Sequence, residues 1–233
     1  MDSIDAMPAE EFESDEMQEE ELESDAMQEE ELELEIESLK KRVAIVIGST
    51  RPGRISAGIA EWFLDTAQTG SPLRYELVDL AEVNLPFLDE PVMAAQSHYE
   101  HEHTRVWSRL IGSYDGFIFV FPQYNWGYPG VLKNALDFLY WEWREKPVSF
   151  VTFGTRGGSR AAAQIQVVLQ GLHMRELADH LEVRIAEDDV DEQWQLKDIQ
   201  AILSPYWAQT RAIDEEMVAA LTTPGPQVVD VQP

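Results

Sequence analysis

The sequence of 233 residues contains no cysteine. This absence excludes disulfide bonds, thiolate catalysis and zinc sites built from cysteine. Long apolar runs are also missing: the longest candidates, residues 43–47 and 117–121, have the length of strands, whereas a membrane span needs about 18 apolar residues. The N-terminus has neither the basic and apolar regions of a secretory signal nor an Arg-rich transit peptide. We therefore expect a cytoplasmic protein without a membrane span.

Basic residues are scarce. The chain has 17 Lys and Arg against 44 Asp and Glu, and its formal net charge is −27. Residues 1–38 hold 18 of the acidic residues and no Lys or Arg, which leaves −9 for the other 195 residues. Because nucleic-acid binding requires a dense basic face, we expect no nucleic-acid partner.

The acidic N-terminal segment contains two adjacent copies of one decapeptide, residues 13–22 and 23–32. Its high charge and small apolar content predict a disordered acidic N-terminal tail, at most transiently helical, over residues 1–38. The remaining residues, 39–233, form the predicted domain. A solvating tail is the simplest interpretation, and a segment that contacts a basic partner or targets the chain is the alternative.

Short apolar runs alternate with helical patterns through the rest of the chain. Strands are predicted at residues 43–48, 73–80, 116–121, 148–153 and 180–185, and helices at 55–68, 102–113, 131–144, 159–176 and 205–221. The pattern predicts an α/β fold, a doubly wound five-stranded parallel sheet with helices on both faces. Such sheets bind ligands beyond the carboxyl ends of their strands. The loops at residues 48–56, 122–130 and 154–160 are therefore the candidate site.

The first of these loops has the features of a phosphate site. It joins a strand to a helix N-terminus, where free backbone amides favour an anion. Ser49, Thr50 and Ser56 add hydroxyl donors, and Arg51 and Arg54 add charge. The loop lacks the Lys and the following Ser or Thr of a Walker loop, and it contains no GxGxxG motif. The alternative is a capped turn whose arginines only reach solvent.

The second and third loops suit a planar ligand. Residues 122–130 combine the rings of Tyr124, Trp126 and Tyr128 with two amides, which favours a heteroaromatic ring such as a flavin. These rings could instead belong to the core or an interface. The glycines of residues 154–160 permit close backbone approach but fit a flexible turn equally well. The predicted helix 131–144 carries apolar residues on several faces, which predicts a subunit interface.

Two further clusters of polar residues are weaker candidates. His98, His101 and His103 lack the spacing of a helical metal motif, so we predict no metal site and expect a structural or lid role for them. The acidic residues at 188–192 are predicted to form a solvated loop.

Together these segments resemble the NADPH-dependent FMN reductase family, which includes quinone reductases and azoreductases. The resemblance covers about residues 42–186 and is carried by residues 48–54 (GSTRPGR), 122–125 (PQYN), 132–137 (LKNALD) and the Gly157-Gly158 pair. It implies a flavodoxin-like fold, non-covalent FMN, and a homodimer or homotetramer. It also implies that the FMN phosphate is held by Ser49, Arg51, Arg54 and Ser56, that the ribityl chain and ring lie against Gln123, Tyr124, Asn125 and Trp126, and that Thr155 and Gly157 lie near the ring edge. Many relatives have Glu where Gln123 stands.

The predicted function is an FMN-dependent NAD(P)H oxidoreductase. Hydride passes from NADPH or NADH through bound FMN to a quinone, azo compound, free flavin or metal oxyanion by a ping-pong mechanism, and no acid–base residue is required. One alternative is a flavin-binding sensor or electron carrier without turnover. The other is an interaction protein recruited through its acidic tail.

Overall fold

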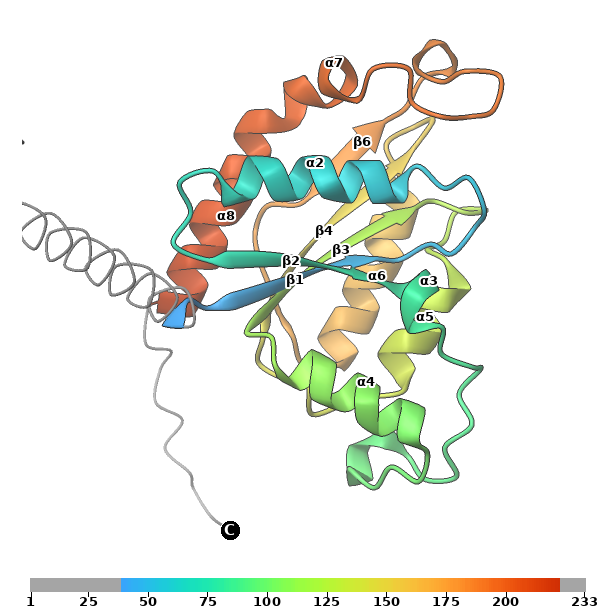
Figure 1. Ribbon diagram of the computed structural model, residues 1–233, viewed down its shortest axis with the longest axis vertical. Coiled ribbons are helices and arrows are strands. Elements are labelled where there is room, and N and C mark those ends of the chain that lie inside the picture. The colour runs from blue at the N-terminus through green and yellow to red at the C-terminus, as the bar shows by residue number, and fades with distance from the viewer. Residues whose placement is uncertain (1–38, 223–233) are drawn as a thin grey trace, which may run out of the picture. The chain divides into compact units, whose positions relative to one another are not determined.

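The computed structural model describes residues 39–222, which contain one mixed α/β domain (Figure 1). Its strands all run parallel in the order β2-β1-β3-β4, and both β5 and β6 pair with β4. Their bounds are β1 Arg42–Ile47, β2 Arg74–Asp79, β3 Gly116–Pro122, β4 Pro147–Gly154, β5 Arg175–Glu176 and β6 Leu181–Arg184. The predicted tail at residues 1–38 lies outside the described residues.

The burial of the strands follows their place in the sheet. All seven residues of β3 and the first seven of β4 are buried, whereas in the edge strand β2 only Tyr75 and Val78 are buried. Continuously apolar runs were predicted where both faces of a parallel sheet are covered, and the central strands confirm this.

Helices cover both faces of the sheet (Figure 1). One face packs against α2, α7 and α8, and the other packs against α4, α5 and α6. The bounds are α2 Ser56–Gln68, α3 Leu80–Val83, α4 Glu102–Gly112, α5 Gly130–Asp137, α6 Ser159–Gly171, α7 Ile199–Leu203 and α8 Trp207–Thr222. This arrangement confirms the predicted doubly wound, flavodoxin-like fold. Within residues 39–222, no helix is long and apolar enough to cross a membrane.

The predicted helix 131–144 is wrong in its second half. Helix α5 ends at Asp137, and the turns that follow point Phe138 and Trp143 into the core, where both are fully buried. The indole Nε1 of Trp143 donates to the carbonyl of Leu136 at 3.1 Å, which fixes the ring inside the domain. Among the large apolar side chains of residues 131–144, only that of Trp141 is exposed, at 50%. The prediction of an interface from a continuous helix with several apolar faces therefore loses its basis.

The predicted helix 159–176 is also too long at its end. Helix α6 ends at Gly171 rather than at residue 176, and His173 takes a left-handed backbone angle, φ 56°, that turns the chain back toward the sheet. The chain then pairs with the start of β4 through β5, leaves the ladder, and pairs with the end of β4 through β6. The predicted strand 180–185 is confirmed by β6, whereas β5 is a short extra strand at the same edge, where the sequence predicted the end of a helix.

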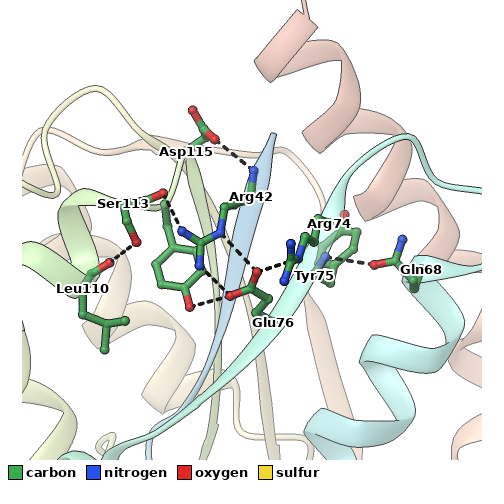
Figure 2. A network of polar contacts seen from close by, with 9 residues as sticks. Arg42, Gln68, Arg74, Tyr75, Glu76, Leu110, Ser113 and Asp115 are labelled. Carbon is green, nitrogen blue, oxygen red and sulfur yellow. Dashed lines mark hydrogen bonds and ion pairs between the residues drawn. The ribbon is translucent and has the colours of Figure 1, made fainter. Parts of the chain in front are cut away.

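A polar network joins the amino ends of β1, β2 and β3, opposite the candidate loops. Figure 2 shows the Glu76 carboxylate between two guanidinium groups. Arg42 donates to it at 2.7 and 3.1 Å, and Arg74 lies 2.7 Å from it. Tyr114 donates to the same carboxylate at 3.0 Å, and Asp115 accepts from the Arg42 amide at 2.9 Å. These contacts tie the three strands together at the end of the sheet that carries no candidate loop.

Candidate functional site

A pocket lies at the carboxyl end of the sheet. Its volume of about 220 Å³ is below the range of about 300–1,000 Å³ that is usual for ligand pockets. A ligand larger than this volume must extend from the pocket along its rim. The lining comes from the ends of β1, β3, β4 and β6: Ser49, Arg51, Arg54, Ile55, Ser56, Pro122, Gln123, Tyr124, Phe153, Gly154, Thr155, Ile185, Val190 and Trp194.

The loop between β1 and α2 supplies the basic side of the pocket. Arg51 is exposed, and its guanidinium has no hydrogen-bond or ion-pair partner among residues 39–222. Arg54 is more deeply placed and forms an ion pair with Asp79, the last residue of β2. The Asp79 carboxylate also accepts from the Ala81 amide at 2.9 Å and so caps α3. One arginine is therefore fixed by the sheet, and the other is available to a ligand.

Two buried polar atoms of this loop lack a partner among the described residues: the hydroxyl oxygen of Ser56 and the Nε of Arg54. Ser56 is fully buried at the first position of α2, beside the free amides of a helix N-terminus. Buried polar atoms are normally hydrogen-bonded, so an unpartnered donor at such a site indicates a ligand group that accepts. A phosphate supplies such acceptors, and the residues present thus fit the phosphate of FMN.

The loop after β3 supplies the aromatic side. Tyr124 and Gly127 exchange two backbone hydrogen bonds of 2.8 Å around a two-residue turn. The central residues, Asn125 and Trp126, both have positive φ, 48° and 72°, as in a type I′ turn. The Tyr124 hydroxyl lies 3.0 Å from the Ser49 hydroxyl, which joins this turn to the phosphate loop.

Gln123 has a role that its sequence position did not reveal. Its Oε1 accepts from the backbone amides of Arg160 at 3.1 Å and Ala161 at 3.2 Å, in the first turn of α6. The N-cap residue of α6 is Gly158, and the Gln123 side chain caps two amides of the first turn from the neighbouring loop, which links the loops after β3 and β4. Its amide nitrogen has no partner among residues 39–222, so one donor remains at the pocket.

The loop after β4 requires glycine. Gly158 has a φ of +89°, and a Cβ on it would collide with the Thr152 side chain. Gly157 also has positive φ and is buried against the backbone of Glu182 in β6. Thr155 lies on the exposed side of the turn and lines the pocket.

Seven of the ten predicted site residues therefore line one pocket: Ser49, Arg51, Arg54, Ser56, Gln123, Tyr124 and Thr155. Asn125 and Trp126 lie in the adjoining turn, and Gly157 is buried and does not line the pocket. Their contacts with FMN stay a prediction.

The histidine-rich segment lies elsewhere and contacts its own neighbourhood. The rings of His101 and His103 stack with centroids 5.2 Å apart, and Nε2 of His103 lies 2.9 Å from the Asp89 carboxylate. Glu90 accepts from the backbone amides of Glu100 and His101 at 2.8 and 3.0 Å. These contacts hold the loop at residues 84–101 against α4. Residues 39–222 contain no group of three or more His, Asp or Glu side chains placed to hold a metal ion.

Comparison with known proteins supplies the family. Residues 41–188 match the NADPH-dependent FMN reductase family. The chain belongs to that family. The assignment confirms the predicted resemblance and, with it, an oxidoreductase that uses FMN and NAD(P)H.

Individual proteins similar to this reductase support the same family assignment. The NAD(P)H-dependent FMN reductase ntnL of Nectria sp is 41% identical over 135 residues, which cover 55% of this chain and 67% of the relative. The NAD(P)H-dependent FMN reductase LOT6 of Saccharomyces cerevisiae is 40% identical over 144 residues, 57% of this chain and 75% of the relative. Among solved structures, the flavoenzyme FerB of Paracoccus denitrificans shares the fold at a TM-score of 0.59 and 19% identity, over 76% of this chain and 97% of that one.

Sequence reasoning missed part of the reductase's pocket. Asp79, the partner of Arg54, is the last residue of β2 and lies within the predicted strand 73–80, so its place at a carboxyl end of the sheet was a usable signal. Trp194 lines the pocket two residues beyond the acidic residues 188–192, which were predicted to form a solvated loop. In that loop the Asp191 carboxylate accepts from two backbone amides, and Gln195 donates to the Gly53 carbonyl at 2.9 Å. No residue pattern in the sequence indicates this long-range contact.

Proposed function

We propose that this reductase transfers two electrons from NADPH or NADH through FMN to a small acceptor, a quinone, azo compound or free flavin, in ping-pong order. The observation that supports the proposal most directly is the meeting of a phosphate-type loop and an aromatic loop in one pocket, joined by the contact between Ser49 and Tyr124. Relatives named as a benzoquinone reductase and an azoreductase support the acceptor class.

The phosphate end of the cofactor would be held by the loop between β1 and α2. The Ser56 hydroxyl, the Arg51 guanidinium and the amides that begin α2 are the groups with unused donors there. Arg54 contributes charge while Asp79 holds its orientation. Binding of a dianion by fixed donors costs little reorganisation, because the sheet has already placed them.

The flavin ring would lie beside the second and third loops. When bound, FMN would supply the chemistry, since its ring can accept a hydride from NAD(P)H and deliver a hydride, together with one proton from solvent, to the acceptor. The chain's own task is to bind and orient. Tyr124 and Thr155 form the pocket wall, and Gln123 places an amide donor at it. The nicotinamide and then the acceptor would approach the ring in turn from the solvent side of the pocket.

Steady-state kinetics test this proposal. The FMN-loaded protein should oxidise NADPH only when an acceptor such as benzoquinone is present, and double-reciprocal plots at several acceptor concentrations should be parallel. Intersecting lines would exclude the ping-pong order. Flavin binding without turnover would instead support a sensor or electron carrier of the same fold.

Self-association is proposed on the exposed apolar residues of the loop at 84–101. Phe87 and Met93 are 89% and 70% exposed, and the loop that carries them is held by Asn134, which donates to the Pro86 carbonyl at 2.7 Å. An ordered loop that exposes large apolar side chains is typical of an interface, here a homodimer or homotetramer. Light scattering at micromolar concentration should give at least the dimer mass, and a monomer would contradict this proposal.

The acidic segment 1–38 is proposed to take no part in the reductase chemistry and to act as a solvating tail or as a contact for a basic partner. The protein itself is proposed to be cytoplasmic. A variant that begins at residue 39 should keep its FMN content and turnover number, while its formal charge changes from −27 to −9. A large loss of turnover at matched ionic strength would contradict both the domain boundary and this division of roles.

A further inference from the structure

The rim of the pocket carries an arginine stacked on a tryptophan. The guanidinium carbon of Arg160 lies 3.6 Å from the centre of the Trp126 ring. The Gln164 side chain of the next helical turn donates to the Trp126 carbonyl at 3.2 Å. Both ends of Trp126 are therefore held by α6, although 59% of the residue stays exposed.

The backbone at Trp126 is strained. Its φ of 72° is in the left-handed region, where glycine is common and a bulky residue is rare. A large exposed aromatic residue at this turn position destabilises the fold, and such strain is concentrated at ligand-binding sites. Because Trp126 stays 59% exposed, little apolar burial offsets this strain, which points to a ligand that uses the ring.

Arg156 and Arg160 make this part of the rim cationic. Neither side chain has a carboxylate partner among residues 39–222, although the chain is strongly acidic. Both belong to the segment that surrounds the pocket: Arg156 follows Thr155, and the Arg160 amide bonds to Gln123. These two arginines are separate from Arg51 and Arg54, which lie at the phosphate loop.

We propose that Trp126, Arg160 and Arg156 bind the adenosine end of NADPH and select it over NADH. The inference rests on the proposed function and names the nucleotide that it uses. The two nucleotides differ only by the 2′-phosphate dianion of NADPH, and a planar guanidinium binds phosphate through two parallel hydrogen bonds. The exposed indole offers a flat surface to the adenine. NADPH is larger than the pocket, so a bound NADPH molecule must extend to the rim.

The test uses adenosine 2′,5′-bisphosphate and adenosine 5′-monophosphate as probes, titrated by calorimetry into the FMN-loaded protein. The wild type should bind the bisphosphate about 10-fold or more tightly than the monophosphate, as expected for charge-assisted hydrogen bonds. Arg160→Ala should remove most of that difference, and Arg160→Lys should restore only part of it. Arg109→Ala on α4, which removes an equal charge from a residue paired with Glu102, is the matched control and should change neither affinity.

Kinetics provide a second readout. In Arg160→Ala and Arg156→Ala the ratio of KM for NADPH to KM for NADH should rise about 10-fold. In Trp126→Gly both KM values should rise together. The thermal midpoint of Trp126→Gly should stay the same or increase, because glycine adopts a positive φ without strain. Equal binding of the two probes by the wild type would overturn the inference. A rise in KM for an anionic acceptor, with the nucleotide ratio unchanged, would overturn it as well. FMN titration of the same preparations tests the proposed function separately.

Discussion

The hydroxyls of Ser49 and Tyr124 lie 3.0 Å apart, although 75 positions separate them in the sequence. Ser49 follows β1, and Tyr124 follows β3, its neighbour in the sheet. The contact is the direct link between the phosphate loop and the aromatic loop, so the two halves of the pocket are positioned together.

Tyr124→Phe tests that link. Loss of one neutral hydrogen bond should weaken FMN binding about 2- to 10-fold, because the phosphate loop loses a contact that fixes Ser49. Tyr128→Phe is the matched control: this hydroxyl is in the same segment and has no hydrogen-bond partner among residues 39–222, and burial raises its pKa to about 12. FMN titration by fluorescence measures both. Equal effects of the two variants would contradict the proposed role of the contact.

Arg51 and Arg54 should behave differently when each is replaced by alanine. Arg51→Ala removes an exposed side chain and should weaken FMN binding about 10- to 100-fold with a change in stability below about 0.5 kcal/mol. Arg54→Ala should weaken FMN binding and also cost about 1–3 kcal/mol of stability, since the side chain of Asp79, only 14% exposed, loses its partner.

Calorimetry, urea unfolding and the rate of flavin reduction by NADPH distinguish these effects. The double variant should lose FMN affinity far more than it loses reduction rate in the flavin-saturated protein. Unchanged FMN affinity with a slower reduction step would mean that the arginines do not bind the phosphate.

Gln123 is predicted to act on stability as well as on the site. Gln123→Leu removes the acceptor for the amides of Arg160 and Ala161 and should cost about 0.5–2 kcal/mol, the usual loss for a helix cap. Gln123→Glu keeps an acceptor and adds negative charge at the amino end of α6, so it should retain that stability. Thermal unfolding at neutral pH compares them. If both variants are equally destabilised, capping is not the role of Gln123.

The Glu76 network predicts a specific pH dependence. Hydrogen bonds from Arg42 lower the pKa of Glu76 below its ordinary value of 4.5. A carboxylate with a lowered pKa in the folded state contributes stability that is present above the unfolded-state pKa and is lost as the pH falls through the folded-state value. The free energy of unfolding should therefore fall below about pH 4.5 more steeply in the wild type than in Glu76→Gln.

Urea unfolding between pH 3 and 7 measures this difference. Glu61→Gln, at an exposed position of α2, is the control and should follow the wild type. Parallel curves for the wild type and Glu76→Gln would show that the network contributes nothing through its charge.

The sequence predicted those parts of the fold whose signals are local. Continuous apolar runs located β1, β3 and β4, and the loops that follow these strands supply most of the pocket. The end of α5 was missed because Phe138 and Trp143 continue a helical apolar spacing, and only packing against the sheet shows that both turn inward. Trp194 was missed for a similar reason: its place depends on the Gln195–Gly53 contact, which joins residues 142 positions apart.

The measurement that tests the account most directly is an anaerobic titration of the purified, FMN-saturated protein with NADPH, followed by absorption. We predict that FMN stays with the protein through gel filtration and that its visible band is bleached by about one equivalent of NADPH per FMN, since both carry two electrons. Loss of the flavin from folded protein on the column, or a visible band unchanged by excess NADPH, would contradict the assignment of this pocket to a reductase.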